Sequence, residues 1–132
     1  MNYLLAYAAS LLAMLGLDAL WLGLIAKSLY RSQIGHLMAA QVQLLPALAF
    51  YAVYAIGIVY LVVMPTVNAP WRATLIAGAV FGLCAYATYD LTNLATLRDW
   101  PLRISLIDMT AGMVVTTIAA SAGRAVLAWF GR

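Results

Sequence analysis

Residues 73–97 read ATLIAGAVFGLCAYATYDLTNLATL, an apolar run that contains a single charged side chain, Asp90. As an α-helix rising about 1.5 Å per residue, the run would be about 38 Å long, which is enough to cross the ~30 Å hydrocarbon core of a bilayer. A spanning β-strand would take about 10 residues of alternating polarity, and the run shows no such alternation. The stretch therefore predicts a transmembrane helix.

The whole chain has the composition of an integral membrane protein. Of its 132 residues, 67% are hydrophobic and 8% are charged, whereas about 25% of the residues in a soluble domain are charged. Three further apolar runs are also long enough to span, so the sequence predicts an all-α membrane protein with four transmembrane helices in an antiparallel bundle. The expected spans are residues 3–26, 44–64, 73–97 and 104–125, within one domain that covers residues 1–132.

The links between the spans are short, apart from residues 27–43. Residues 98–103 are so few that the third and fourth helices should form an antiparallel hairpin. In the longer, polar and amphipathic link we expect a polar turn followed by a helical approach to the second span. In the alternative, the second helix begins near Ile34 and kinks at Pro46.

Basic side chains give a weak indication of orientation, because Lys and Arg gather on the cytoplasmic side of membrane proteins. The first and third links carry four bases and the opposite side carries three. This difference favours cytoplasmic links and places both termini on the outer side. The two groups are Lys27, Arg31, Arg98 and Arg103 in the links, and Arg72, Arg124 and Arg132 on the other side.

Three of the four acidic residues occupy one depth in the predicted bundle. Counted along their helices from the same membrane face, Asp18, Asp90 and Asp108 lie about 12, 10 and 6 Å inside it. A charged side chain in a spanning helix costs about 2.5–3.5 kcal/mol on insertion scales, so these carboxylates should face the bundle interior or a water-filled cavity. The fourth acid, Asp99, falls in the link that covers this layer.

Carboxylates at one depth repel one another unless a base reaches them or at least one holds a proton. The layer is therefore either an ion-pair network with the bases of that end or a proton-bearing site. In the functional interpretation, Asp18, Asp90 and Asp108 are candidate catalytic residues. The candidate binding residues lie near the same end and are Trp21, Tyr30, Arg31, His36, Tyr86, Tyr89, Asn93, Arg98, Trp100 and Arg103. In the structural interpretation, the polar groups only hydrogen-bond one helix to another.

No cofactor or metal ion is expected. The chain has one cysteine, Cys84, and one histidine, His36, so it offers no internal disulfide and no metal motif of paired cysteines or histidines. The net charge of +3 comes from a few scattered bases, which argues against a nucleic-acid partner. Gly78 and Gly82 form a GxxxG pattern, which is typical of close helix packing inside a bundle or between the subunits of a homodimer.

Two stretches of the chain resemble a known family. They are LDALWLGLIAKSLYRSQIGHL, residues 17–37, and YATYDLTNLATLRDWPLRISLIDMTAG, residues 86–112. Both are similar to a bacterial family of small four-span membrane proteins that is catalogued only as a domain of unknown function. The resemblance implies the same architecture and a bacterial inner membrane, and it implies no reaction. Where members of that family carry a tryptophan before the glycine of the fourth helix, this chain has Ala111, which would enlarge a pocket or remove an aromatic wall.

Three functions fit these observations, with membrane lipids as surroundings and partners in each. The first is an enzyme or binding protein for a lipid-like or isoprenoid-like molecule, in which Asp90 or Asp18 acts as a general acid or base or stabilises a developing positive charge. The second is a proton-coupled transporter that works as a homodimer, by architectural likeness to small multidrug exporters. The third is a structural or assembly subunit. The sequence does not decide whether the protein is an enzyme.

Overall fold

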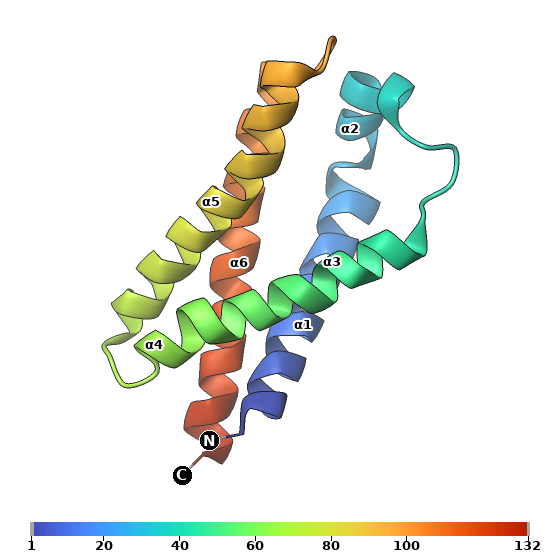
Figure 1. Cartoon of the computed structure of the whole chain (residues 1–132). Coiled ribbons are helices and arrows are strands. Elements are labelled where there is room, and N and C mark those ends of the chain that lie inside the picture. Colours follow the sequence, from blue (N-terminus) through green and yellow to red (C-terminus); the bar gives the residue numbers. More distant parts are fainter. Residues whose placement is uncertain (1, 132) are drawn as a thin grey trace.

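Four helices in the computed structural model, which describes residues 2–131, are long and apolar enough to cross a membrane. They are Tyr3–Ile25, Leu44–Thr66, Trp71–Thr96 and Leu102–Phe130. Successive helices run in opposite directions, and residues 2–131 contain no β-strand (Figure 1). The prediction of an all-α membrane protein with a four-helix antiparallel bundle is confirmed.

Two of the spans contain a π-helical turn, in which the hydrogen bonds run from residue i to i+5 rather than i+4. The elements in chain order are α1 (Tyr3–Leu20), the π-helical η1 (Trp21–Ile25), α2 (Lys27–Ile34), the 3-10 turn η2 (Gly35–Leu37), α3 (Leu44–Gly57), the π-helical η3 (Ile58–Val63), α4 (Met64–Thr66), α5 (Trp71–Thr96) and α6 (Leu102–Phe130).

Helices α5 and α6 form a close antiparallel hairpin. In the turn between them Asp99 takes a left-handed backbone conformation with φ of 40°, which Asp tolerates better than most residues. The GxxxG glycines bring the helices together, because a Cβ added to Gly82 would lie 2.7 Å from the carbonyl oxygen of Gly112, and one added to Gly78 would lie 3.0 Å from the Cα of Thr117. These two glycines therefore pack inside the bundle.

Helix α6 lies at the centre of the bundle, and both α1 and the second span pack against it (Figure 1). The interface between them is apolar, with Met14 of α1 and Ala119 of α6 fully buried. Side-chain hydrogen bonds add to this packing: Ser10 Oγ donates to the carbonyl oxygen of Ala119 at 2.9 Å, and the Tyr54 hydroxyl lies 2.8 Å from Thr116 Oγ1. Such contacts contribute about 0.6–2 kcal/mol each in a membrane.

Residues 27–43 differ from both expectations for this link. The helical part, α2, follows the first span directly instead of leading into the second. It packs Ile34 against Trp100 and Ile104. Residues 38–43 are not helical, and the second span begins at Leu44. Pro46 lies in the first turn of that helix, where no backbone N–H has a helical partner to lose, so it causes no kink.

The connections between the helices lie at the two opposite ends of the bundle. The start of α1 and the end of α6 lie at the same end as the connection between α4 and α5 (Figure 1). The α2 helix lies at the other end, together with the turn between α5 and α6. We refer to this second end as the α2 end.

Candidate functional site

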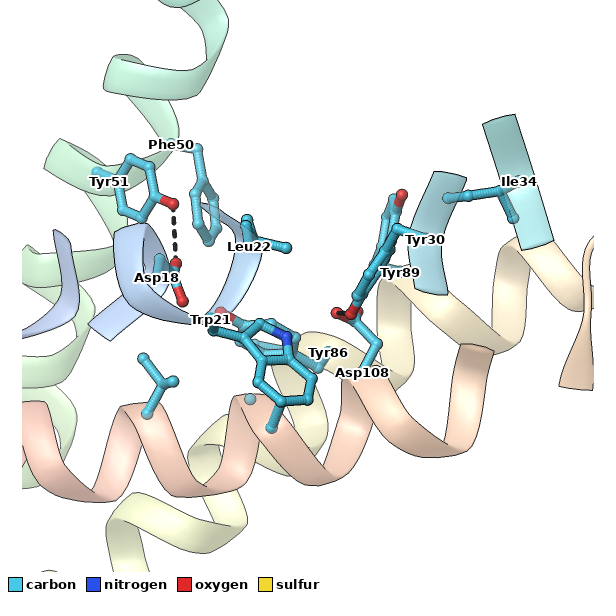
Figure 2. Close-up of a pocket in the computed structure, with 14 residues that line it drawn as sticks. Asp18, Trp21, Leu22, Tyr30, Ile34, Phe50, Tyr51, Tyr86, Tyr89 and Asp108 are labelled. Atoms are coloured by element: carbon cyan, nitrogen blue, oxygen red, sulfur yellow. Dashed lines mark hydrogen bonds between the residues drawn. The ribbon is translucent and has the colours of Figure 1, made fainter. Parts of the chain in front are cut away.

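A cavity of about 510 Å³ lies near the α2 end, bounded by α1, α2, α3, α5 and α6. Six of the fourteen residues that line it are aromatic, and two are carboxylates, Asp18 and Asp108. The aromatic residues are Trp21, Tyr30, Phe50, Tyr51, Tyr86 and Tyr89. Figure 2 shows Asp18 and Asp108 apart from each other, with Trp21 lying between them.

The π-helical turn η1 helps to bring α2 onto this cavity. In an uninterrupted α-helix Tyr30 would lie about 120° around the axis from Asp18, and Ile34 would lie farther still. A π-helical turn advances less around the axis per residue, so every side chain after Trp21–Ile25 is rotated relative to those before it. As a result Asp18, Tyr30 and Ile34 all line the same cavity.

Each of the two lining carboxylates accepts a hydrogen bond from a tyrosine on a different element. The Tyr51 hydroxyl of α3 donates to Asp18 Oδ2 at 2.8 Å, and the Tyr30 hydroxyl of α2 donates to Asp108 Oδ1 at 2.5 Å (Figure 2). Burial and the bond to Asp108 raise the pKa of Tyr30 well above its usual value. The phenol therefore keeps its proton and remains a donor.

Asp90 lies outside the cavity wall, in the packed core. Its side chain is fully buried, and neither carboxyl oxygen has a hydrogen-bond partner among residues 2–131. Asp108 lies close enough to interact with it electrostatically. The backbone at this point is held by Ser105, whose Oγ donates to the Asp90 carbonyl oxygen at 3.4 Å and accepts from Trp100 Nε1 at 3.1 Å.

The floor of the cavity depends on a glycine. A Cβ added to Gly112 would lie 2.2 Å from the ring of Tyr86, so that ring lies directly on the backbone of α6. Tyr89 is fixed differently, because its ring meets Trp100 edge to face with 5.5 Å between centroids. These contacts hold two of the aromatic walls in place without using their hydroxyl groups.

The described basic side chains of the α2 end form no ion pair with Asp18, Asp90 or Asp108. Within residues 2–131 the only ion pair joins His36 Nε2 to Asp99 Oδ2, at 3.9 Å and on the surface. Arg98 and Arg103 are exposed, and Arg31 is exposed on the outer side of α2. Of the two interpretations of the carboxylate layer, the ion-pair network is therefore wrong.

Of the residues proposed from sequence for the site, two carboxylates and four aromatic residues line the cavity, namely Asp18, Asp108, Trp21, Tyr30, Tyr86 and Tyr89. Asp90 and Trp100 are buried behind them, and Asn93 is half-buried outside the wall. The four remaining residues lie away from it: Arg31, His36, Arg98 and Arg103.

Sequence reasoning missed the contribution of α3, which supplies Phe50 and Tyr51. A signal for Tyr51 existed, because it lies seven residues after Leu44, at a depth of about 10 Å. That is the depth of the carboxylates. A tyrosine so far from the membrane interface needs a polar partner, and Asp18 provides it.

A second hollow, an apolar groove of about 560 Å³, adjoins the cavity between the first span and α6. Trp21, Ala111 and Val115 line both spaces. Ala111 is the position at which the resembling family was expected to carry a tryptophan. The small side chain here leaves the two spaces next to each other, whereas an indole would occupy the boundary between them.

Residues 2–131 contain no cluster of three or more His, Cys, Asp or Glu side chains that could hold a metal ion. A family model described as "Predicted membrane protein (DUF2177)" matches residues 3–125, which is nearly the entire chain. This match confirms the resemblance to a membrane family of unknown function. No curated protein and no solved structure gave a significant match.

Proposed function

The chain belongs to the DUF2177 family of membrane proteins, and we propose that it binds, or binds and processes, a lipid-like or isoprenoid-like small molecule in the cavity at the α2 end. The observation that carries this proposal is the cavity itself. It has about 510 Å³ of space, aromatic walls and two carboxylates. That volume falls within the ~300–1,000 Å³ that ligand pockets usually have, and few polar groups on an apolar wall are their usual lining.

The adjoining groove supports an amphiphilic ligand rather than a fully polar one. Its lining is almost entirely apolar and includes Leu20, Ile25, Leu106 and Val114, all of which are exposed on the surface that would face lipid. A hydrocarbon chain in this groove could continue past Ala111 into the cavity, where a polar group would meet Asp18 or Asp108.

If the protein is an enzyme, the two lining carboxylates are the groups able to act on the ligand. Either could take or give a proton, or stabilise positive charge that develops in an isoprenoid-like substrate. Asp90 does not reach the cavity wall, so we assign it no direct contact with the ligand. It would act only through its neighbour Asp108.

The proposal can be tested by purifying the full chain from membranes in a mild non-ionic detergent and analysing bound molecules by native mass spectrometry and lipidomics. We expect a lipid-like species to co-purify with the wild type and to be lost from Ala111→Trp, which fills the boundary between cavity and groove. Asp99→Asn, at the surface turn, is the matched control and should retain the species. A wild type and control that carry nothing above the level of Ala111→Trp would refute the proposal.

A proton-coupled transporter is a second proposal, favoured by a different observation. Asp18, Asp90 and Asp108 have no basic partner among the described residues, so protons or a cationic substrate must balance their charge. In proteoliposomes this function predicts substrate flux that requires a proton gradient and is lost in Asp18→Asn. Flux that is independent of the gradient across lipophilic cations and amines would exclude it.

A further inference from the structure

From the charges and rings of the cavity we infer the chemical class of the ligand's polar group: it is an organic cation, an amine or a quaternary ammonium, on a hydrocarbon chain. The inference rests on the proposed binding function and makes it more specific. A lipid-like ligand alone could carry a neutral, anionic or cationic head group. The residues around Asp18 and Asp108 favour one of these three kinds of head group.

The first argument is the charge of the wall. Asp18 and Asp108 both line the cavity. Within the part of the chain that the structure describes, Asp18 accepts one hydrogen bond, from the Tyr51 hydroxyl, and Asp108 accepts one from the Tyr30 hydroxyl. A carboxylate can accept about four hydrogen bonds, so each retains free acceptor sites. No lysine, arginine or histidine of the described residues forms an ion pair with either carboxylate. The proton that the layer requires is best placed on Asp90, which is fully buried and lies outside the cavity. With Asp18 and Asp108 ionised, an anionic head group would meet repulsion, and a cationic one would meet two acceptors that lack a counter-ion.

The second argument is the kind of side chain that completes the wall. Six aromatic residues line the cavity with these carboxylates, and Trp21 lies between the two acids (Figure 2). The face of an aromatic ring attracts a cation, most strongly for tryptophan, and cages of several rings are how proteins recognise quaternary ammonium groups. A neutral hydrocarbon ligand would bind equally well against a wall of aliphatic side chains. The wall therefore combines the two kinds of group that favour an alkylammonium.

The third argument is the position of the hydrocarbon chain. The groove beyond Ala111 is apolar and opens on the exposed face of the first span and α6. A small soluble cation would leave this groove empty, whereas an alkylammonium would occupy both spaces at once. The geometry thus favours a cationic amphiphile over a free cation of the same head group.

The test compares probes that share one chain and differ in head group. Full-length protein in a bulky maltoside detergent is titrated with decyltrimethylammonium, decyl maltoside and decyl sulfate below their micelle concentrations, and binding is followed by calorimetry. We expect decyltrimethylammonium to bind at least about tenfold more tightly than the other two, the scale of one desolvated cation–π or charge-assisted contact. Tetramethylammonium, which has no chain, should bind at least about tenfold more weakly than the decyl cation.

Two variants separate charge from shape. Asp18→Asn with Asp108→Asn keeps oxygen acceptors for Tyr51 and Tyr30 but removes both charges, and it should lose the preference for the cation. Asp99→Asn removes a surface carboxylate that does not line the cavity, so this variant should keep the preference for the cation. Size-exclusion profiles and helical circular dichroism verify that each variant is folded, and if the double variant does not fold, each single Asn variant should reduce the preference.

The possible results point to different conclusions. Equal binding of the three decyl probes, weakened in all cases by Ala111→Trp, would overturn the inferred charge and leave the proposed function standing. A cation preference that persists in the double variant would also overturn the inferred charge. No saturable binding of any probe would refute the proposed function itself. Tetramethylammonium binding as tightly as the decyl cation would support the inferred charge and contradict a lipid-like ligand.

Discussion

The most informative single residue of the cavity is Ala111, because it lies at the boundary between the aromatic cavity and the apolar groove. The next residue along α6, Gly112, fixes the position of the Tyr86 ring on α5. Neither residue carries a chemical group of its own. The small side chain of Ala111 keeps the cavity and the groove next to each other, and the missing side chain of Gly112 makes room for the Tyr86 ring.

Replacing Gly112 by alanine should damage the cavity more than the fold elsewhere. The new methyl group would lie 2.2 Å from the Tyr86 ring, so the ring or α6 must move. Overpacking of this kind costs about 1–3 kcal/mol, which should appear as a lower free energy of unfolding in mixed-micelle titrations with a denaturing detergent. Gly16→Ala is the matched control, because a Cβ at Gly16 meets nothing within 4 Å. Equal stability of the two variants would contradict this packing.

Replacing Tyr30 by phenylalanine should loosen α2 without unfolding the bundle. The change removes the donor to Asp108 and keeps the ring. A single interhelical hydrogen bond in a membrane contributes about 0.6–2 kcal/mol, so a modest loss of stability is expected. Hydrogen exchange should increase in α2 and remain unchanged in α5. Unaltered exchange throughout α2 would show that the Tyr30 bond does not hold this helix.

At the scale of elements, the two features that the amino-acid pattern did not indicate are the π-helical turn η1 and the buried arginine of α6. The turn sets the rotation of α2 relative to α1. Arg124 was counted from sequence among the interfacial bases that orient the chain. In the structure it is buried and donates to the carbonyl oxygens of Ala69 and Pro70 and to Thr74 Oγ1, with its guanidinium 4.4 Å from the centre of the Trp71 ring.

Arg124→Met should destabilise the connection between α4 and α5. The substitution keeps an unbranched side chain but leaves the part-buried Ala69 carbonyl oxygen without its Arg124 donor, whereas the Pro70 carbonyl oxygen keeps the Ala73 N–H at 2.9 Å. An unsatisfied buried acceptor costs about 1–3 kcal/mol. We expect faster proteolysis at this connection and a lower unfolding free energy, compared with Arg72→Met as control. Identical proteolysis of the two variants would argue that Arg124 has no structural role here.

Deleting two residues from η1 should separate the stability of the spans from the shape of the cavity. Without Gly23 and Leu24 the first span favours a regular α-helix in which Tyr30 lies about 80° around the axis from Asp18, so α2 turns away from the cavity. The span would still be long enough to cross the membrane. We therefore expect normal membrane insertion, with loss of any co-purifying lipid-like species. Deleting Gly23 alone is the control, because a regular helix one residue shorter keeps Tyr30 within about 20° of Asp18; it should retain the species, and a double deletion with full ligand content would contradict the role given to η1.

At the scale of the whole molecule, the start of α1 and the end of α6 lie at the end of the bundle opposite α2 (Figure 1). The Lys and Arg count predicts that the α2 end faces the cytoplasm. The burial of Arg124 weakens that count on the opposite side, because a base that is enclosed by protein does not interact with the membrane surface. The expected orientation is therefore favoured slightly more than the bare count of four against three suggests.

This orientation can be measured with single cysteines in a Cys84→Ala background. Ser32→Cys, at the α2 end, should react with a membrane-impermeant thiol reagent only after the cells are opened. Asn68→Cys, at the opposite end, should react in intact cells. The reverse pattern would place the α2 end outside, and labelling of both sites in intact cells would indicate two orientations.

The amino-acid sequence by itself determined the class of protein and the four spans, and it predicted one depth for Asp18, Asp90 and Asp108, because spanning length, apolar composition and the cost of intramembrane charge act on each helix separately. Only the tertiary structure decided which of those carboxylates line a cavity, that no base of residues 2–131 pairs with them, and that Phe50 and Tyr51 line the same cavity. The reason is physical. Those facts depend on the rotation of one helix against another, which is set by the η1 turn and by the Gly82–Gly112 and Gly112–Tyr86 contacts rather than by the hydrophobicity of any segment.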